Sequence, residues 1–389
     1  LESDGYIKGQ TLLRRSLVQE RSSLESLGVN KEFWRGKKVF ITGHTGFKGG
    51  WLSLWLNDIG ANVTGFALPP ATKPSFFDIC SVDSSAKSII GDVRDYTGLK
   101  KCIQDESPDI LFHMAAQALV LDSYKDPIET YETNLMGTVN ILNSIRECPS
   151  VKALVNITSD KCYENIEKLS GYIEEDRMGG FDPYSSSKAC SELITAAYRA
   201  SFFNPKEYLE HGVGIATARS GNVIGGGDWS KNRLIPDLYK AILSNTAITI
   251  RNPYATRPWQ HVLEPLSGYL NLAEKLFVNG SDFSESWNFG PNFKDVQTVH
   301  DVATKFVTQW GSDTSINIES KISRPHEANL LTLDCSKAIE RLKWSPQVNS
   351  EETIKMTCDW YKFFNKGETD MRSFSLDQIR YYESALIEK

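Results

Sequence analysis

The chain has 389 residues, of which 40% are hydrophobic and 11% aromatic, so it can bury a large core as one elaborated domain or as two. Its formal net charge of -6 comes without a clustered basic stripe, so the sequence has no electrostatic footprint for nucleic acid or for an anionic membrane surface. We therefore expect small-molecule ligands, with no nucleic-acid partner and no membrane partner.

Cysteine and histidine spacing gives no sign of a metal site. The seven cysteines are odd in number and scattered, with no C-x-x-C and no paired Cys/His spacing. The six histidines include no i, i+4 pair, and no apolar run approaches the ~20 residues of a membrane span. We expect reduced thiols, no catalytic metal and a cytoplasmic location.

The predicted elements follow a polar segment, residues 1–30, which we interpret as a mobile N-terminal arm. From residue 38 onward strands alternate with helices, which is typical of a parallel sheet in an α/β protein. The predicted strands cover 39–41, 62–67, 88–90, 110–113, 153–157 and 214–218, and the predicted helices cover 50–59, 97–104, 128–146 and 184–201.

After Gly221 the pattern changes, because glycine- and proline-marked loops now separate short strands from amphipathic helices such as 263–278 and 298–310. We therefore predict a Rossmann-type doubly wound parallel sheet in residues 31–220, which would bind a dinucleotide and carry the catalytic residues. Residues 221–389 would form a smaller C-terminal lobe that mainly binds the substrate.

A glycine-rich turn follows the first predicted strand and opens a helix. Its spacing is G-x-x-G-x-x-G, and its backbone N–H groups could approach a pyrophosphate at the helix N-terminus. A purely structural strand-to-helix turn is the alternative for the motif in isolation. The predicted cofactor contacts of this turn are Gly43, Thr45, Gly46, Phe47 and Gly49.

Further cofactor contacts are predicted where the third and fourth strands end. Asp92 follows the third strand, where its carboxylate could accept from an adenine amino group or be an ordinary turn aspartate, and Val93 is next to it. Ala115 and Gln117 lie in the loop after the fourth strand. The second strand ends without an acidic residue at the ribose-reading position, so NADP is not excluded as an alternative to NAD.

Tyr184 and Lys188 are one helical turn apart, so both side chains fall on one face of the helix. A nearby ammonium favours the phenolate, which would bring the tyrosine down from its usual pKa of about 10 so that it can take a proton from a substrate hydroxyl. Together with the glycine turn and the strand that ends in Thr158-Ser159, the pair resembles the extended short-chain dehydrogenase/reductase superfamily over roughly residues 37–364. The resemblance implies a redox triad of Ser159, Tyr184 and Lys188.

The strand-end triplet narrows this resemblance to the sugar-nucleotide 4,6-dehydratases, which carry Thr-Asp-Glu where this chain has Ser159-Asp160-Lys161. Asp160 could protonate a departing C6 hydroxyl, so that water leaves. Lys161 replaces the usual glutamate base. A lysine at its ordinary pKa of about 10.4 is protonated at pH 7, so Lys161 must be perturbed to act as the C5 base, or else it stabilises an enolate as a fixed cation. Of the two roles, we predict that Lys161 is the base.

Four longer stretches resemble the CDP-glucose 4,6-dehydratase subfamily: Gly43–Trp51, Thr158–Tyr163, Arg219–Trp229 and Arg257–Val262. The resemblance implies NAD as cofactor and CDP-D-glucose as substrate, which would become the 4-keto-6-deoxy sugar nucleotide that feeds 3,6-dideoxyhexoses of bacterial surface polysaccharide. It also implies substrate contacts from Asn134, Asn222, Arg233 and Arg257, and a homodimer or homotetramer held by a bundle of the helices over 128–146 and 184–201.

Three alternatives stay open at this point. A sugar-nucleotide 4-epimerase would share the fold, Tyr184 and Lys188 but would have no use for Asp160. A dehydratase could instead act on a dTDP, GDP or UDP sugar, because no residue can be assigned from the sequence to recognition of the cytosine base. A nucleotide-sensing regulatory protein would have kept the fold and lost the chemistry.

Overall fold

The central sheet is built from the buried apolar runs that follow one another along the first half of the chain. A computed structural model describes residues 28–250, 252–318, 330–367 and 369–387. Seven parallel strands lie in the order β11-β6-β5-β4-β1-β2-β3. Their bounds are β1 Lys38–Thr42, β2 Asn62–Ala67, β3 Lys87–Ile90, β4 Ile110–His113, β5 Ala153–Ile157, β6 Gly214–Ser220 and β11 Ser286–Phe289.

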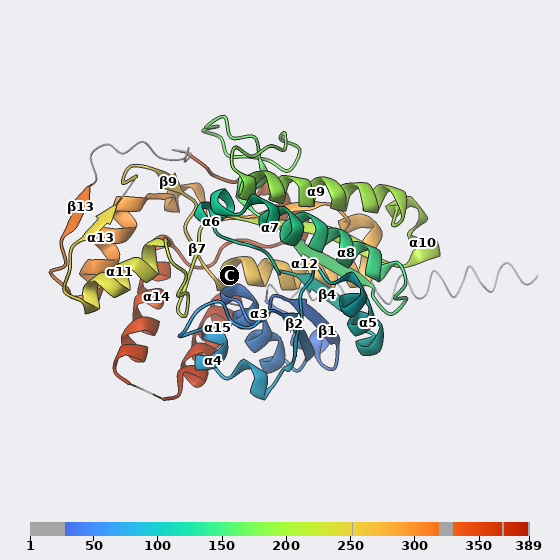
Figure 1. Cartoon of the computed structure of the whole chain (residues 1–389), viewed down its shortest axis with the longest axis horizontal. Coiled ribbons are helices and arrows are strands. Elements are labelled where there is room, and N and C mark those ends of the chain that lie inside the picture. The colour runs from blue at the N-terminus through green and yellow to red at the C-terminus, as the bar shows by residue number, and fades with distance from the viewer. Residues whose placement is uncertain (1–27, 251, 319–329, 368, 388–389) are drawn as a thin grey trace, which may run out of the picture.

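Alternate residues of these strands enter two separate cores, as the period of two along a strand requires. In β4, Ile110 and Phe112 join one buried cluster while Leu111 joins the other. Helices α5, α8 and α9 pack on one another over the second face, and α12 and α15 pack with α3 over the first. Both layers are visible in Figure 1. The predicted doubly wound parallel sheet is confirmed.

The helices of the two layers begin where capping residues or glycines allow. Asp182 caps α9 by accepting from the Ser185 amide, and Pro183 occupies its first turn. The long helix predicted over 128–146 is interrupted by a π-helical segment, η2. The bounds are α2 Lys31–Trp34, α3 Phe47–Asp58, α5 Tyr96–Glu106, α6 Val120–Lys125, α7 Pro127–Tyr131, η2 Glu132–Met136, α8 Gly137–Ile145, α9 Pro183–Ser201, α12 Leu263–Phe283 and α15 Met371–Ile387.

The rest of the chain after Ser220 forms short two-stranded sheets with helices packed against them, on the left of Figure 1. Helix α13 packs on α11 and α14. The strands are β7 Val223–Ile224, β8 Ile248–Ile250, β9 Thr256–Arg257, β10 Gln260–His261, β12 Gln297–Thr298 and β13 Ile316–Ile318. The helices are α11 Leu234–Leu243, α13 Val299–Trp310 and α14 Ser350–Asn365.

Smaller elements connect these parts: α4 Phe76–Ile79, η1 Val82–Ser84, η3 Asp160–Cys162, η4 Pro205–Glu207, α10 Tyr208–His211, η5 Phe293–Asp295 and η6 Ala338–Leu342. Strand β11 and helix α12 belong to the central layers although they follow residue 220, so the division at that residue stays a prediction. Of the predicted mobile arm, residues 1–27 lie outside the described residues. No helix in the described ranges combines the length and apolarity that a membrane span needs.

Candidate active site

In the glycine turn between β1 and α3, Gly43 and Gly49 are closely packed against the protein, whereas Gly46 is open to solvent. Gly43 has φ +79°, and a Cβ there would lie 2.7 Å from the backbone nitrogen of Ala115. A Cβ at Gly49 would lie 2.1 Å from the Gly43 carbonyl oxygen. At Gly46, by contrast, a Cβ would meet only that same carbonyl oxygen, at 3.3 Å, and the residue is exposed at the N-cap of α3. This open backbone at a helix N-terminus fits a dinucleotide pyrophosphate.

Two further predicted residues of the turn take part in its packing. The Thr45 hydroxyl donates to the Leu68 carbonyl at 2.8 Å, which ties the turn to the end of β2. Phe47 begins α3 and is half-buried.

The Asp92 carboxylate is already engaged. Its Oδ1 accepts from the Arg94 amide at 2.9 Å, and its Oδ2 accepts from Arg94 Nε and Nη2 at 2.9 and 2.6 Å. These hydrogen bonds lower the pKa of Asp92. Arg94, which the sequence analysis missed, thus fixes the carboxylate next to the buried Val93. The predicted contact of Asp92 with an adenine amino group stays a prediction.

Gln117 and Asn134 fasten the loop after β4 to the helices behind it. The Asn134 Oδ1 accepts from the Gln117 amide at 2.8 Å, and its Nδ2 donates to the Gln117 carbonyl at 3.0 Å and to Ser187 Oγ at 2.9 Å. The Gln117 side-chain amide donates to the carbonyl of Leu119 and to Thr130 Oγ1. Because both N–H groups of the Asn134 amide are used inside the protein, its geometry favours a positioning role. Ala115 lies at the start of the same loop, where its amide donates to Thr42 Oγ1 at 3.2 Å.

The five predicted catalytic residues come together where β5 ends against α9. Ser159 caps η3, which carries Asp160 and Lys161, and η3 packs against α9, the helix of Tyr184 and Lys188. A hydrogen bond links the side chains of Tyr184 and Ser159. Lys188 Nζ donates to the Ile157 carbonyl at 3.1 Å, at the last residue of β5.

Burial is the main cause of the pKa shifts of Tyr184 and Lys188. It raises the pKa of Tyr184 to about 12, although the hydrogen bond to Ser159 and the charge of Arg233 oppose the rise. It also lowers the pKa of Lys188 to about 8. The expected fall in the pKa of Tyr184 is therefore wrong for the chain alone, because desolvation of the phenolate outweighs the favourable charges.

Asp160 has one engaged carboxylate oxygen and one free one. Its Oδ1 accepts from Ser159 Oγ at 3.0 Å and lies 3.5 Å from Lys161 Nζ. Its Oδ2 is buried and has no hydrogen-bond partner among the described residues. A Cβ at Gly221 would lie 2.7 Å from that oxygen, so glycine leaves the space that the carboxylate needs. A buried oxygen without a partner is costly and suits a group that meets a ligand.

The predicted substrate residues of the second lobe lie near Gly221 and the catalytic residues. Asn222 follows Gly221, and its Oδ1 is buried without a partner among the described residues. Arg233 Nη1 contacts Asp228 Oδ2 at 2.9 Å, and the guanidinium interacts electrostatically with Tyr184. Arg257 is buried on β9 and donates to the Thr256 carbonyl. The next residue, Pro258, borders Gly221.

Lys48 belongs to the same cluster of charges, although the sequence analysis passed over it as a variable position of the glycine turn. Its Nζ donates to Ser220 Oγ at 3.3 Å, at the end of β6. Burial lowers the pKa of Lys48 to about 7, with further lowering by Lys188 and Arg233 and an opposing effect of Asp160. The signal that could have identified it is a lysine in the first helical turn, between the second and third glycines of the G-x-x-G-x-x-G motif.

A search of known protein families matches residues 40–357 to the model described as GDP-mannose 4,6 dehydratase. This chain belongs to that family. It is 53% identical over 357 residues to CDP-glucose 4,6-dehydratase of Salmonella typhimurium, a match that covers 92% of this chain and 99% of the relative. The family membership confirms the predicted resemblance to the sugar-nucleotide dehydratases of the extended short-chain dehydrogenase/reductase superfamily.

Solved structures of related enzymes share the fold. The dTDP-glucose 4,6-dehydratase of Bacillus anthracis, in complex with NAD, superposes with a TM-score of 0.72 at 21% identity, covering 85% of this chain and 98% of that one. The UDP-glucose 4-epimerase of Thermotoga maritima, with UDP-glucose, also gives a TM-score of 0.72 at 21% identity, covering 85% and 99%. Dehydratases and epimerases thus share this architecture, so the fold does not separate the two reactions.

Proposed function

We propose that the chain is an NAD-dependent CDP-glucose 4,6-dehydratase, which converts CDP-D-glucose to CDP-4-dehydro-6-deoxy-D-glucose and water. The similarity to the Salmonella enzyme over nearly the whole of both chains supports the substrate. The observation that carries the reaction type is Asp160, a buried carboxylate beside Ser159 and Tyr184 with one oxygen free. An epimerase has no step that needs such an acid.

The cofactor would lie on the glycine turn, with Gly46 and the N-terminus of α3 at its pyrophosphate and with Asp92, Val93, Ala115 and Gln117 along its adenosine and ribose parts. NAD bound there would supply the hydride acceptor for C4 and the hydride donor for C6, and its positive nicotinamide would favour the phenolate of Tyr184. NAD in the complex of the Bacillus anthracis dehydratase supports this cofactor.

The chain's own residues then move the protons. Tyr184 takes the proton of the C4 hydroxyl, while Ser159 hydrogen-bonds the same oxygen and Lys188 orients the site. Asp160 protonates the C6 hydroxyl, which leaves as water. Lys161 lies 3.5 Å from Asp160 and is part-exposed, which favours a fixed cation that stabilises the enolate charge.

Asn222, Arg233 and Arg257 would hold the nucleotide diphosphate, for which two guanidiniums are suited.

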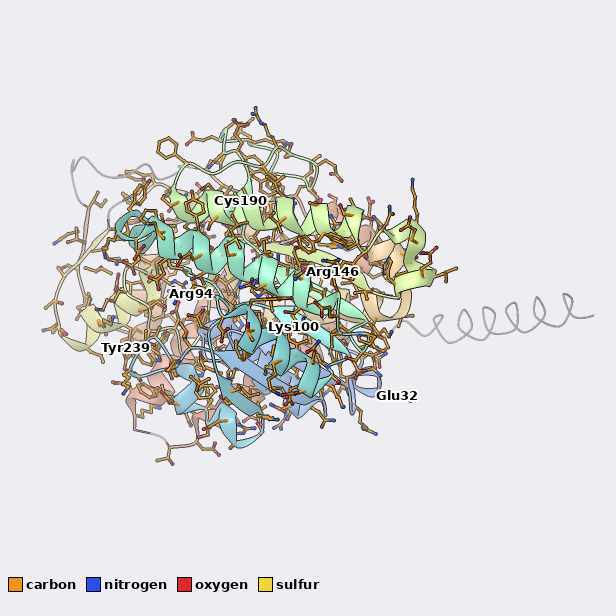
Figure 2. All side chains as sticks on the ribbon, turned by 45° about the vertical axis from the view of Figure 1, so that its right-hand side comes forward. Glu32, Arg94, Lys100, Arg146, Cys190 and Tyr239 are labelled. Atoms are coloured by element: carbon orange, nitrogen blue, oxygen red, sulfur yellow. The ribbon has the colours of Figure 1, made fainter. Side chains whose placement is uncertain are left out.

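We also propose a homo-oligomer formed through the helices of one face. Helix α9 carries Cys190 and packs beside α8, which leads to Arg146, on the face turned towards the viewer in Figure 2. The exposed apolar side chains of this helical layer are Ile128, Met136, Leu193 and Phe202. Light scattering should give the mass of a dimer or a tetramer, and a monomer would contradict the proposal.

The proposed location is the cytoplasm. All seven cysteines are free thiols, and reduced thiols persist in that compartment.

The test of the proposed function is the product. The enzyme with NAD and CDP-glucose should release a nucleotide sugar that is lighter by one water, without net consumption of cofactor. A product of unchanged mass would indicate an epimerase, and no turnover at all would favour a regulatory protein.

A further inference from the structure

Lys48 lies on α3, yet it interacts electrostatically with the catalytic residues Lys188 and Asp160. It lies in the first turn of α3, and its Nζ donates to Ser220 Oγ at 3.3 Å and lies 5.8 Å from the centre of the Tyr269 ring. Ser220 in turn hydrogen-bonds the Tyr269 hydroxyl at 2.7 Å. The amine is thus placed at the end of β6, beside Gly221, whose missing side chain makes room for Asp160 Oδ2.

The charges around Lys48 are mostly positive. Lys188 on α9 and Arg233 before α11 both disfavour its ammonium, and the Asp160 carboxylate favours it. The other titratable groups of the cluster are Tyr184 on α9 and Tyr269 on α12. Within the part of the chain that the structure describes, no carboxylate oxygen forms an ion pair with Lys48. Burial, two cations and the positive end of α3 all act in one direction.

Lys161 differs from Lys48 in its hydrogen-bond partner, although both side chains are half-buried. It lies 3.5 Å from Asp160 Oδ1, and its side chain is 31% exposed. A lysine that is desolvated and lies among cations loses its proton more readily than a lysine in water.

We infer that Lys48 is the base that takes the C5 proton in the elimination step. The inference rests on the proposed dehydratase function and deepens it. After C4 is a ketone, the neutral Lys48 amine takes the proton of C5, and the electron pair of the C5–H bond forms the C5=C6 double bond. The C6–O bond breaks, and the oxygen leaves as water with the proton of Asp160. The Lys48 ammonium afterwards returns a proton to C5 when C6 is reduced.

The pKa of Lys48, lowered to about 7 chiefly by burial, supports the inference, because a general base works best when its pKa is near the operating pH. This property can be measured without turnover. Competitive acetylation of the enzyme's amines, followed by peptide mass spectrometry from about pH 6 to about pH 10, should give a labelling midpoint near neutrality for Lys48. A midpoint near the ordinary lysine value of about 10.4 would overturn the inference.

The chemical test compares Lys48→Met, Lys48→Arg and the control Lys101→Met, which replaces an exposed lysine of α5, in a single turnover with NAD and CDP-glucose in D2O. Both Lys48 variants should still reduce the cofactor, yet lose water release and deuterium incorporation at C5 by at least ~10²-fold, since arginine keeps the charge but cannot accept the proton. Lys101→Met should keep the exchange at C5 at the wild-type rate.

Three outcomes would overturn the inference. Lys48→Arg could release water within a few-fold of the wild-type rate. The Lys48 variants could lose cofactor reduction and water release equally, which would indicate a role in binding alone. The wild-type enzyme could release no water, in which case the proposed function itself fails, and that result is distinct from the other two.

Discussion

At the residue scale, burial decides which groups of the site can exchange protons. Tyr184 is almost fully buried and hydrogen-bonded to Ser159, so replacing its hydroxyl removes a proton acceptor without opening a cavity. Tyr184→Phe should bind cofactor nearly normally and lose turnover by at least ~10²-fold. The measurement is kcat together with cofactor affinity by fluorescence titration. Activity close to that of the wild type would mean that the proton goes elsewhere.

Asp160 is expected to act only when the C6 oxygen leaves. Asp160→Asn keeps the shape of the side chain and removes the transferable proton, so C4 oxidation should continue while water release slows. A substrate with fluoride at C6 has a leaving group that needs less protonation and should be processed comparatively well by the variant. Rates of both substrates with both proteins provide the comparison. An equal loss on the two substrates would rule out the general-acid role.

Lys161 lies next to Asp160 in sequence and within 3.5 Å of its Oδ1. If it stabilises the enolate as a fixed cation, Lys161→Arg should retain substantial activity, because arginine keeps the charge, whereas Lys161→Met should be slow. The measurement is kcat of both variants across the pH range. An inactive arginine variant would instead favour Lys161 as the C5 base and would count against the role given to Lys48.

At the scale of elements, α9 is joined to the sheet by a buried ion pair. Glu192 on α9 accepts from Arg219 Nε and Nη2 of β6 at 2.9 Å each, and both side chains are 3% exposed. Burial alone would raise the pKa of Glu192, but the guanidinium and the hydroxyls of Thr158 and Thr217 hold it below its usual range. The contribution of the pair to stability is therefore present above about pH 4.3 and lost as the pH falls further.

Arg219→Met should lower the free energy of unfolding by about 3–5 kcal/mol at neutral pH, since it leaves a buried carboxylate without its partner. The matched control is Lys101→Met, which breaks the exposed pair with Asp105 on α5 and should change stability by less than about 0.5 kcal/mol. Urea unfolding followed by circular dichroism measures both. Equal, small effects of the two variants would show that the buried pair does not hold α9 on the sheet.

Elements with strong, uniform burial could be predicted from the sequence. The structure has β2, β4 and β5 at their predicted bounds; every residue of β4 and β5 is buried, and so is every residue of β2 except Asn62 and Thr64. Helices α14 and α15 and strand β11 were missed. Strand β11 is four residues long and pairs with β6, which lies about 70 positions earlier in the chain, so only tertiary pairing identifies it.

At the scale of the whole molecule, the site is assembled from segments far apart in the chain. The sequence could indicate Ser159, Tyr184 and Lys188, because they lie within a strand end and the next helix. It could not indicate that Lys48 and Arg233 lie in the same cluster, or that the Asn134 side-chain amide hydrogen-bonds the backbone of Gln117. Those relations depend on how β1, β4, β5 and β6 are ordered in the sheet.

The most direct test of the central claim is mass spectrometry of the products formed by the enzyme with NAD from CDP-, dTDP-, GDP- and UDP-glucose. We predict that CDP-glucose is consumed fastest and gives a nucleotide sugar lighter by one water, with no net reduction of NAD. A product of unchanged mass, or faster dehydration of one of the other three sugars, would contradict the account.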